Sequence, residues 1–303
     1  MKEEWDAFVK ASRNGTFLFM RDYMNYHQDR YTDYSLMIYH DDILCALLPA
    51  TLHTDDKVIK SHGGLTYGGL ISDNTITAEK TLNIFSAILD FYREKNVAEK
   101  IIYRPVPHIY HRYPCEEELY ALFRNNAKLT ERKISSTIKL KDALPFKGRR
   151  KLTATTKSRL QILEDDCFEE FWNILTCRLV EKYNVAPVHT LDEIKLLHSH
   201  FPENIKLFRV ISDNKTTLGG LVIYIMGNVV HIQYTGTTDE GRRIGVLDHL
   251  YSYLIKERFA NYEYMDFGNS VEDGGRFLNS GLIAQKEGLG GRAVMYDTYE
   301  LNI

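Results

Sequence analysis

Apolar residues recur at a helical period in several stretches of the chain, most clearly over residues 78–95. There Leu82, Phe85, Ile88 and Leu89 fall on one face, which predicts an amphipathic helix that packs against a core. The same spacing predicts helices before the Asn14-Gly15 stop, over residues 21–29, 116–126, 168–182 and 246–259, and after the capping-box pattern that begins at Thr190.

Shorter apolar runs bounded by turn residues predict strands in both halves of the chain. They lie at residues 34–39, 43–52, 58–61 and 101–104 in the first half, and at 205–211, 218–226, 229–235, 262–267 and 293–301 in the second. Asp41-Asp42 aligns with Asp213-Asn214 at an offset of about 172 residues, the scale of a duplicated domain. The sequence therefore predicts two copies of one α/β unit, over residues 1–145 and 146–303.

Composition agrees with a chain of two globular domains. The 303 residues are 44% hydrophobic and 26% charged, which are ordinary proportions for a folded protein. The four cysteines are widely spaced and form no CxxC pair, so we expect neither a disulfide scaffold nor a zinc ribbon. His108 and His111 lie among prolines that break any helix that would align them. We predict no metal and no permanently bound cofactor.

The N-terminus and the net charge indicate the cellular setting. Charged residues follow Met1, and no stretch approaches about 18 uncharged apolar residues, so we expect no signal peptide, no transmembrane segment and a cytoplasmic location. A net charge of −3 argues against DNA as a partner. The basic segment over residues 147–159 could bind the phosphates of a nucleotide-linked substrate or of tRNA, or it could be a solvated linker. The oligomeric state is left open.

A strand, a short loop and a helix start follow one another in the second half. The predicted strand 229–235 runs into Arg242, Arg243, Ile244 and Gly245, and a helix is expected from Val246. Free backbone N–H groups and the positive end of a helix dipole suit a phosphate or pyrophosphate at such a turn. An ordinary turn with two solvated arginines is an equally good interpretation of the loop alone.

This loop resembles the acyl-CoA pyrophosphate site of the GNAT acetyltransferases, which reads Gln/Arg-x-x-Gly-x-Gly/Ala. Here Arg242 and Gly245 match, and Leu247 departs from the pattern. The whole chain resembles the FemAB/FemX-like branch of that fold, in which two GNAT-like domains stand in tandem. Three stretches carry this similarity: Arg149-Arg150-Lys151 followed by Lys157, Asp266-Phe267-Gly268 at a strand end, and Gln285 to Gly291 before the last strand.

The resemblance implies a fold and a set of site residues. Each domain would be a mixed, mostly antiparallel sheet flanked by helices. Gln233, Tyr234 and Thr235 would supply the oxyanion contact, and Gln233 and Thr235 would bind the donor together with Arg242, Arg243, Ile244 and Gly245. Lys286 would stand near the reacting carbonyl. His231, Glu272 and Asp266 are the candidate bases, and Tyr234 is the candidate acid, because the segment 268–282 has no tyrosine.

A glycine-rich segment occupies the corresponding position in the first half. His62, Tyr67, Gly68 and Gly69 belong to it, and four glycines flank the tyrosine. Such a loop could hold a substrate against its backbone while Tyr67 stacks on a sugar or base. Alternatively, the glycines only make sharp turns.

Three functions are compatible with this sequence. The first is an acyltransferase, an N-acetyltransferase by resemblance, in which acyl-CoA is the co-substrate. Its acceptor would be an amine or hydroxyl of a cell-envelope or polysaccharide precursor, which attacks directly in a ternary complex. The second is a FemX-like enzyme that transfers an amino acid from aminoacyl-tRNA to a peptidoglycan precursor. The third is a binding protein that has kept the fold and lost the activity.

Overall fold

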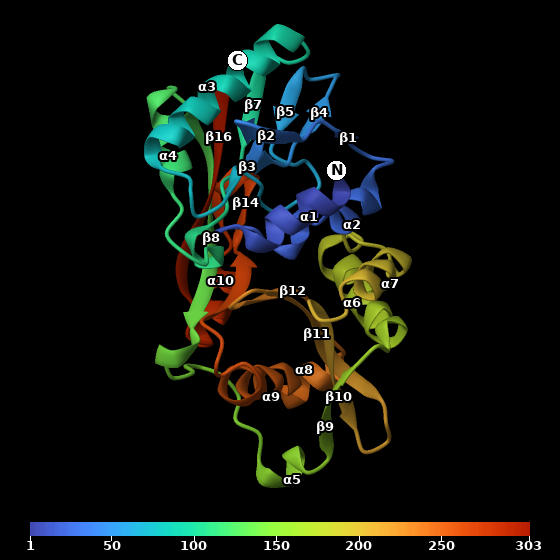
Figure 1. Ribbon diagram of the computed structural model, residues 1–303. Coiled ribbons are helices and arrows are strands. Elements are labelled where there is room, and N and C mark those ends of the chain that lie inside the picture. The colour runs from blue at the N-terminus through green and yellow to red at the C-terminus, as the bar shows by residue number, and fades with distance from the viewer. The chain divides into compact units, whose positions relative to one another are not determined.

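A computed structural model describes residues 1–303, with the side chain of Tyr183 left out (Figure 1). By its contacts the chain divides into two units. Unit 1 comprises Met1–Ile134, Val271–Leu278 and Val294–Ile303, and unit 2 comprises Ser135–Ser270 and Asn279–Ala293. The chain therefore passes from one unit to the other several times. The boundary predicted between residues 145 and 146 separates the two sequence copies, and it stays a prediction.

Unit 1 combines helices with several sets of short strands. Its helices are α1 (Lys2–Ala11), α2 (Arg21–Met24), α3 (Ala78–Lys95) and α4 (Glu117–Arg124). Its strands are β1 (Thr32–Asp33), β2 (Leu36–His40), β3 (Ile43–Leu48), β4 (Thr51–His53), β5 (Val58–Lys60), β6 (Ile71–Ser72), β7 (Lys100–Tyr103), β14 (Val271–Glu272), β15 (Phe277–Leu278) and most of β16 (Arg292–Asn302). One set has the order β1-β4-β5-β7-β16, and another has the order β2-β3-β6.

Unit 2 is built on longer strands. Its helices are α5 (Ala154–Lys157), α6 (Phe168–Tyr183), α7 (Leu191–His200), α8 (Asp239–Ile244), α9 (Val246–Tyr253) and α10 (Ser280–Gly288). Its strands are the end of β8 (Lys128–Lys139), β9 (Leu160–Asp165), β10 (Ile205–Ser212), β11 (Thr217–Met226), β12 (Val229–Thr237) and β13 (Tyr264–Asn269), in the order β8-β13-β12-β11-β10-β9.

The two units repeat one arrangement of strands. In unit 1, β5 is antiparallel to β4 and parallel to β7, and α3 lies between β5 and β7 in the sequence. In unit 2, β12 is antiparallel to β11 and parallel to β13, with α9 between them. In each unit, the strand that pairs with the second parallel strand comes from the other half of the sequence. The late strand β16 pairs with β7 of unit 1, where Figure 1 shows it in red, and the early strand β8 pairs with β13 of unit 2.

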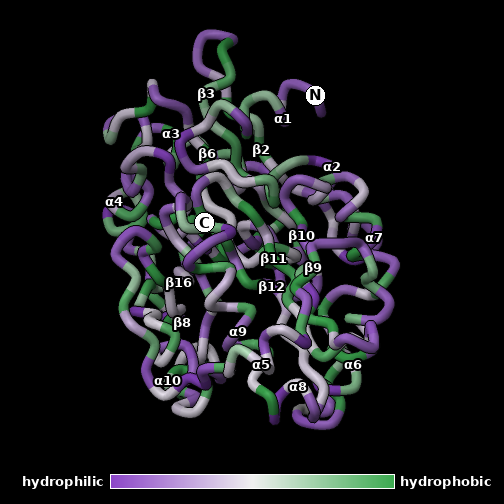
Figure 2. Tube along the Cα trace, turned by 90° about the horizontal axis from the view of Figure 1, so that it is seen from below, coloured by the Kyte–Doolittle hydropathy of each residue, from purple (hydrophilic) through white to green (hydrophobic). Residues whose placement is uncertain are grey.

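Each unit has its own apolar core. In unit 1, Phe85, Ile88 and Tyr92 of α3 pack with Ile59 and Ile101 of the parallel strands. In unit 2, α9 covers one face of the sheet. Figure 2 shows the hydrophobic run of β11, whose residues are all buried.

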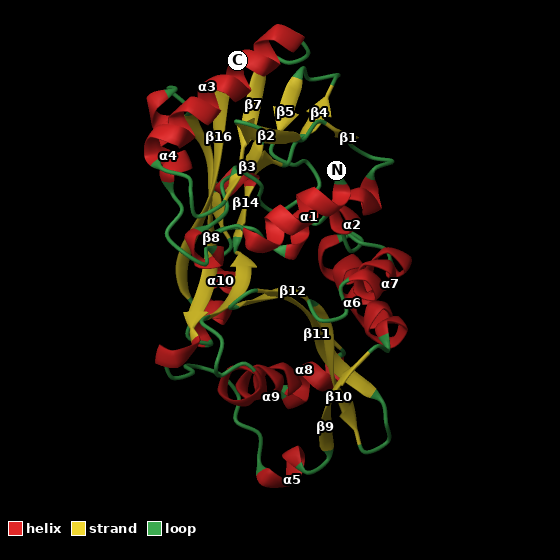
Figure 3. Cartoon of the chain, in the orientation of Figure 1, coloured by secondary structure: helices red, strands yellow, loops and turns green.

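The opposite face of the unit 2 sheet is covered by α6 (Figure 3). The Phe171 ring of α6 packs against Gly220 and Gly236. A Cβ added at Gly220 would lie 3.0 Å from this ring, and a Cβ added at Gly236 would lie 3.2 Å from it. These paired glycines therefore let the helix approach the strands closely. The result is a sheet between two helical layers.

Most of the predicted elements are present. The helix over residues 78–95 and the capping box at Thr190 are confirmed. The sequence predictions missed β8, β9 and α10. The expected helix over residues 246–259 is α9 followed by a π-helical turn over Leu254–Arg258.

Candidate functional site

The parallel strands of unit 2 separate beside a bulge. Their ladder has three pairs and ends at His231 opposite Asp266. On the other side of β12, Val222 pairs with Tyr234 and Ile223 with Ile232, so Gln233 is an extra, bulged residue. A bulge of this kind turns strand backbone away from its ladder. The predicted oxyanion stretch 233–235 thus begins at a bulge next to the end of the parallel ladder.

His231 and Asp266 form a hydrogen-bonded pair at this point. His231 Nδ1 lies 2.9 Å from Asp266 Oδ2, and Asp266 is fully buried. Ser135 Oγ at 2.5 Å, Thr137 Oγ1 at 3.1 Å and the Gly268 N–H at 3.2 Å donate to Asp266 Oδ1. These donors satisfy the buried carboxylate. A neutral His231 that donates Nδ1–H to Asp266 carries its basic lone pair on Nε2.

Lys286 of α10 meets the end of β13. Its Nζ donates to Gly268 O at 2.9 Å and to Asn269 O at 2.7 Å. Burial lowers the pKa of this ammonium to about 8, and the Asp266 carboxylate partly opposes that shift. Unit 2 therefore gathers an imidazole, a carboxylate and an amine around the last residues of β13.

Tyr234 has a partner that sequence reasoning missed. Its hydroxyl accepts from the His189 backbone N–H at 3.2 Å and lies 2.6 Å from His189 Nδ1. The Tyr234 hydroxyl is therefore hydrogen-bonded to both the backbone and the ring of His189. The Trp172 ring packs against Tyr234 edge to face, with 5.1 Å between centroids. Burial raises the pKa of Tyr234, which keeps the phenol protonated. The sequence could not predict the contact between His189 and Tyr234, because it joins a loop residue to a strand residue far away in the chain.

The Arg/Gly turn differs from the expected open loop. Residues 239–244 form α8, and Gly245 at φ +92° separates it from α9. The N–H groups of Gly241, Arg242 and Gly245 bond to Thr238 Oγ1, Thr238 O and Gly241 O. The prediction of free backbone amides is therefore wrong for these three residues. Ile244 packs partly buried against the core.

The basic segment after the first half joins this turn. Arg150 Nη1 donates to the carbonyl oxygens of Arg242, at 3.0 Å, and of Arg243. Asp248, in the first turn of α9, accepts from the Arg150 N–H at 2.8 Å and pairs with Arg149 Nε at 3.2 Å. The basic segment at residues 149–150 and the turn at residues 242–245, which the sequence analysis considered separately, therefore contact each other. We call Arg149, Arg150, Arg242 and Arg243 the arginine cluster.

Thr235, two residues after the bulged Gln233, contacts α9. Its Oγ1 lies 3.2 Å from the Tyr251 hydroxyl. Glu272 belongs to the other unit. It lies exposed on β14 of unit 1, opposite Phe277, whereas the other predicted residues of the donor and catalytic sets lie in unit 2.

The glycine-rich segment of unit 1 is occupied by internal packing. Tyr67 is only 2% exposed, and its ring lies 4.9 Å from that of Tyr110. A Cβ on Gly68 would stand 1.9 Å from Ser61 O, and Gly69 has φ +82° beside the Glu118 carboxylate. The expected stacking of Tyr67 on a substrate is wrong for this structure, because the ring is enclosed.

His62 of the same segment is also enclosed. Burial, aided by the neighbouring His27, lowers its pKa to about 3. It therefore carries no positive charge near neutral pH with which to bind a phosphate.

The part of the chain that the structure describes bears on metals and membranes as follows. Within that part of the chain, three or more His, Cys, Asp or Glu side chains are nowhere grouped to hold a metal ion. Equally, no described helix combines the length and hydropathy needed to cross a membrane.

These features define a chain of two GNAT-like units, and comparison with solved structures confirms that fold. The chain is similar to FemX with a TM-score of 0.68 at 12% identity, over 100% of this chain and 96% of that one. It is similar to L-PGS from Bacillus licheniformis with a TM-score of 0.60 at 12% identity, over 98% and 90%.

A tandem GNAT protein from the clavulanic acid biosynthesis pathway gives a TM-score of 0.51 at 10% identity, over 88% of this chain and 82% of that one. The sequence matches no protein-family model and no curated protein. The predicted FemX-like tandem GNAT fold is thus confirmed by structure.

Proposed function

We propose that the protein is an acyltransferase whose reaction takes place in unit 2, where β12 and β13 separate. The observation that carries this proposal is the buried pair His231–Asp266 at the last rung of the parallel ladder, next to the bulge at Gln233. A bulged strand offers backbone N–H groups to an oxyanion, and a histidine held by a buried carboxylate is a general base.

The reaction is a direct attack of an amine or hydroxyl on an acyl carbonyl. His231 Nε2 accepts the proton of the nucleophile as the new bond forms, and Asp266 stabilises the resulting imidazolium. Backbone N–H groups of the bulged stretch stabilise the oxyanion. The Lys286 ammonium adds positive charge at the end of β13, and the buried Tyr234 phenol is a proton donor to the leaving group.

The donor carries phosphates, and the arginine cluster binds them. The exposed Arg242 and Arg243, beside Arg149 and Arg150 that also contact Asp248 and the turn carbonyls, provide positive charge for the phosphates of CoA, so acyl-CoA is the first candidate. The acceptor is an amine or hydroxyl of a cell-envelope precursor, which rests on the resemblance to FemX alone.

A specific observation favours aminoacyl-tRNA as the second candidate donor. The N–H groups of Gly241, Arg242 and Gly245 are already bonded, and the Asp248 carboxylate lies in the first turn of α9. Both features oppose a pyrophosphate bound to backbone at the helix start, while the exposed arginine side chains still suit a nucleic-acid backbone.

Calorimetric titration with acetyl-CoA and with aminoacyl-tRNA tests this proposal, on the native protein and on the Arg242→Ala, Arg243→Ala variant. Binding of one donor that the double variant loses supports a phosphate-binding role for the cluster. Transfer of the bound acyl group to an added amine supports the activity. Failure of both donors to bind would contradict the proposal.

A further inference from the structure

A cavity of about 510 Å³ lies in unit 1, and its lining includes none of the candidate site residues described above. It is bounded by the β2–β3 hairpin, by the segment 73–76 after β6, and by the first half of α3. Cavities of this size in proteins commonly hold small molecules, with an apolar body inside and a few polar groups that fix its orientation.

The inner walls of the cavity are aliphatic. Ile38 of β2, Leu44 of β3 and Ile76 line it from the sheet side, and Ile84 and Ala87 line it from α3. Lys80, Ile84 and Ala87 stand four and three residues apart, so they form one stripe along the helix. The stripe places a cation at the helix start and aliphatic groups one and two turns further on.

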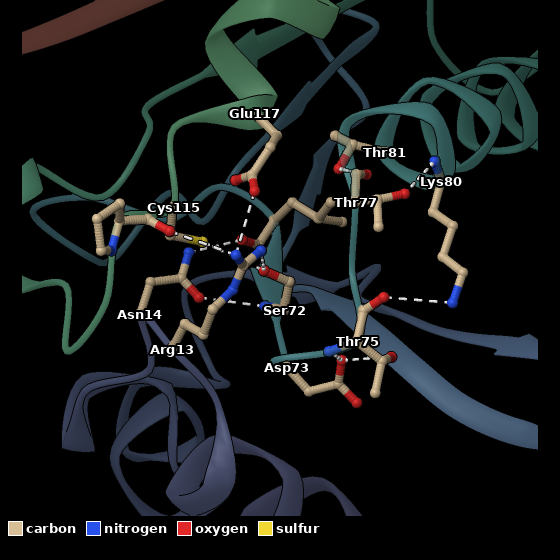
Figure 4. Close-up of polar contacts among 12 residues, drawn as sticks. Arg13, Asn14, Ser72, Asp73, Thr75, Thr77, Lys80, Thr81, Cys115 and Glu117 are labelled. Carbon is tan, nitrogen blue, oxygen red and sulfur yellow. Dashed lines mark hydrogen bonds and ion pairs between the residues drawn. The ribbon is translucent and has the colours of Figure 1, made fainter.

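Two opposite charges stand at the polar edge of the cavity (Figure 4). Asp73 Oδ1 accepts from the Thr75 N–H and from Thr75 Oγ1, each at 2.8 Å. Lys80 Nζ donates to the Thr75 carbonyl at 3.2 Å, which is a neutral acceptor. Each charge is held by Thr75, and both charges line the cavity.

Cys45 of β3 also lines the cavity, and both charges affect the pKa of its thiol. Burial raises the pKa of its thiol, the Asp73 carboxylate raises it further, and the Lys80 ammonium lowers it. The thiol donates to Ile38 O at 3.2 Å. A group inside the cavity therefore lies within the electrostatic reach of an anion and of a cation.

We propose that this cavity is a binding site for a small zwitterion with an aliphatic side chain, that is, a free apolar amino acid. Asp73 binds its ammonium, Lys80 binds its carboxylate, and Ile38, Ile76 and Ile84 surround the side chain. Burial of the side chain supplies affinity, and the two charges select the zwitterion over molecules that have one charge.

Titration by nuclear magnetic resonance tests the site with leucine, N-acetylleucine and leucinamide. The acetyl group removes the ammonium, and the amide removes the carboxylate. Leucine should shift the amide signals of residues 38–45 and 73–87 saturably, and each capped ligand should bind roughly fivefold more weakly, the effect of one partly exposed ion pair.

Variants of the protein test which charge of the ligand each of Asp73 and Lys80 binds. Asp73→Asn keeps a side-chain acceptor for the Thr75 N–H, and it should weaken leucine while leaving N-acetylleucine unchanged. Lys80→Met should weaken leucine and leave leucinamide unchanged. Ala87→Trp should narrow the cavity beside Ile84 and weaken binding of all three ligands. Lys95→Met, at the far end of α3, is the matched control and should change nothing.

Three results would overturn the proposal. They are the absence of a saturable shift with leucine at millimolar concentration, equal affinity for the three ligands, and unchanged leucine binding in Ala87→Trp. If Ala87→Trp does not fold, the changes at Asp73 and Lys80 decide the question.

Discussion

The two units contain the same β-α-β element and end their parallel ladders differently. In unit 1 the backbone fills the position after the ladder of β5 and β7. The Ser61 N–H bonds to Ile102 O at 2.9 Å, the Arg104 N–H to Ser61 Oγ at 2.8 Å, and the Gly68 N–H to Arg104 O at 2.8 Å. In unit 2 the last rung is itself the pair His231 and Asp266, and beyond it Lys286 Nζ donates to the carbonyl oxygens of Gly268 and Asn269.

This difference shows that glycine content does not identify a ligand site. The segment with more glycines is the closed one, because its glycines admit neighbouring backbone and side chains. The turn with fewer glycines is surrounded by exposed arginines. The units differ at the end of the parallel ladder, where unit 1 continues with backbone contacts and unit 2 has ionisable side chains at the last rung and beyond it.

The largest expected effect compares the two histidines. His231→Gln should lower the rate of acyl transfer by roughly 10² to 10⁴, the contribution of a general base, and leave donor affinity unchanged. His62→Gln should leave the rate per folded molecule unchanged and lower the free energy of unfolding by about 1–2 kcal/mol, since a packed side chain is altered. Single-turnover kinetics and urea unfolding measure the two quantities. Equal losses of activity in both variants would remove the distinction between the units.

The next effect is on stability. In Gly68→Ala the new Cβ would lie 1.9 Å from Ser61 O, so unit 1 should lose about 3 kcal/mol of unfolding free energy through overpacking. Gly227→Ala is the control, because Gly227 has φ +62° and open space around it. Only the strain of that conformation, about 1 kcal/mol, should appear there. A Gly68→Ala protein as stable as Gly227→Ala would contradict the close packing of the loop.

How far the sequence predicts this structure depends on how local each signal is. The α3 stripe and the Thr190 capping box are local, and both are confirmed. β8 was missed because its first half is polar and mostly exposed, and its pairing with β13 joins residues far apart in the chain. The contacts of His231 with Asp266 and of Tyr234 with His189 likewise form only in the folded sheet.

The arginine cluster predicts a smaller effect on binding. Arg242→Ala with Arg243→Ala should weaken a phosphorylated donor by roughly tenfold and make the binding less sensitive to salt. Unfolding free energy should change by no more than about 0.5 kcal/mol, since both side chains are exposed. Arg93→Ala with Lys95→Ala is the matched control. Arg93 pairs with Asp90 at the same i,i+3 spacing as Arg242 with Asp239. Equal weakening in both double variants would indicate a general charge effect.

The smallest effect concerns pH. The pKa of Lys286 is lowered from 10.5 to about 8, so its ammonium is lost as the pH rises through about 8. Activity should fall there, and Lys286→Met should lack that alkaline decline. Stability should change in the opposite direction. The unfolded chain binds this proton up to pH 10.5, so the native state gains stability between pH 8 and 10.5. A pH–rate profile that is identical in both proteins would exclude this role.

Hydrogen exchange with a bound donor tests most directly the claim that only unit 2 carries the reaction. Acetyl-CoA and aminoacyl-tRNA are each added, and amide protection is compared along the chain. We predict protection over residues 231–249 with the donor that binds, and unchanged exchange over residues 61–70. Protection confined to residues 61–70 would contradict the account, because the donor would then bind where the backbone closes the ladder.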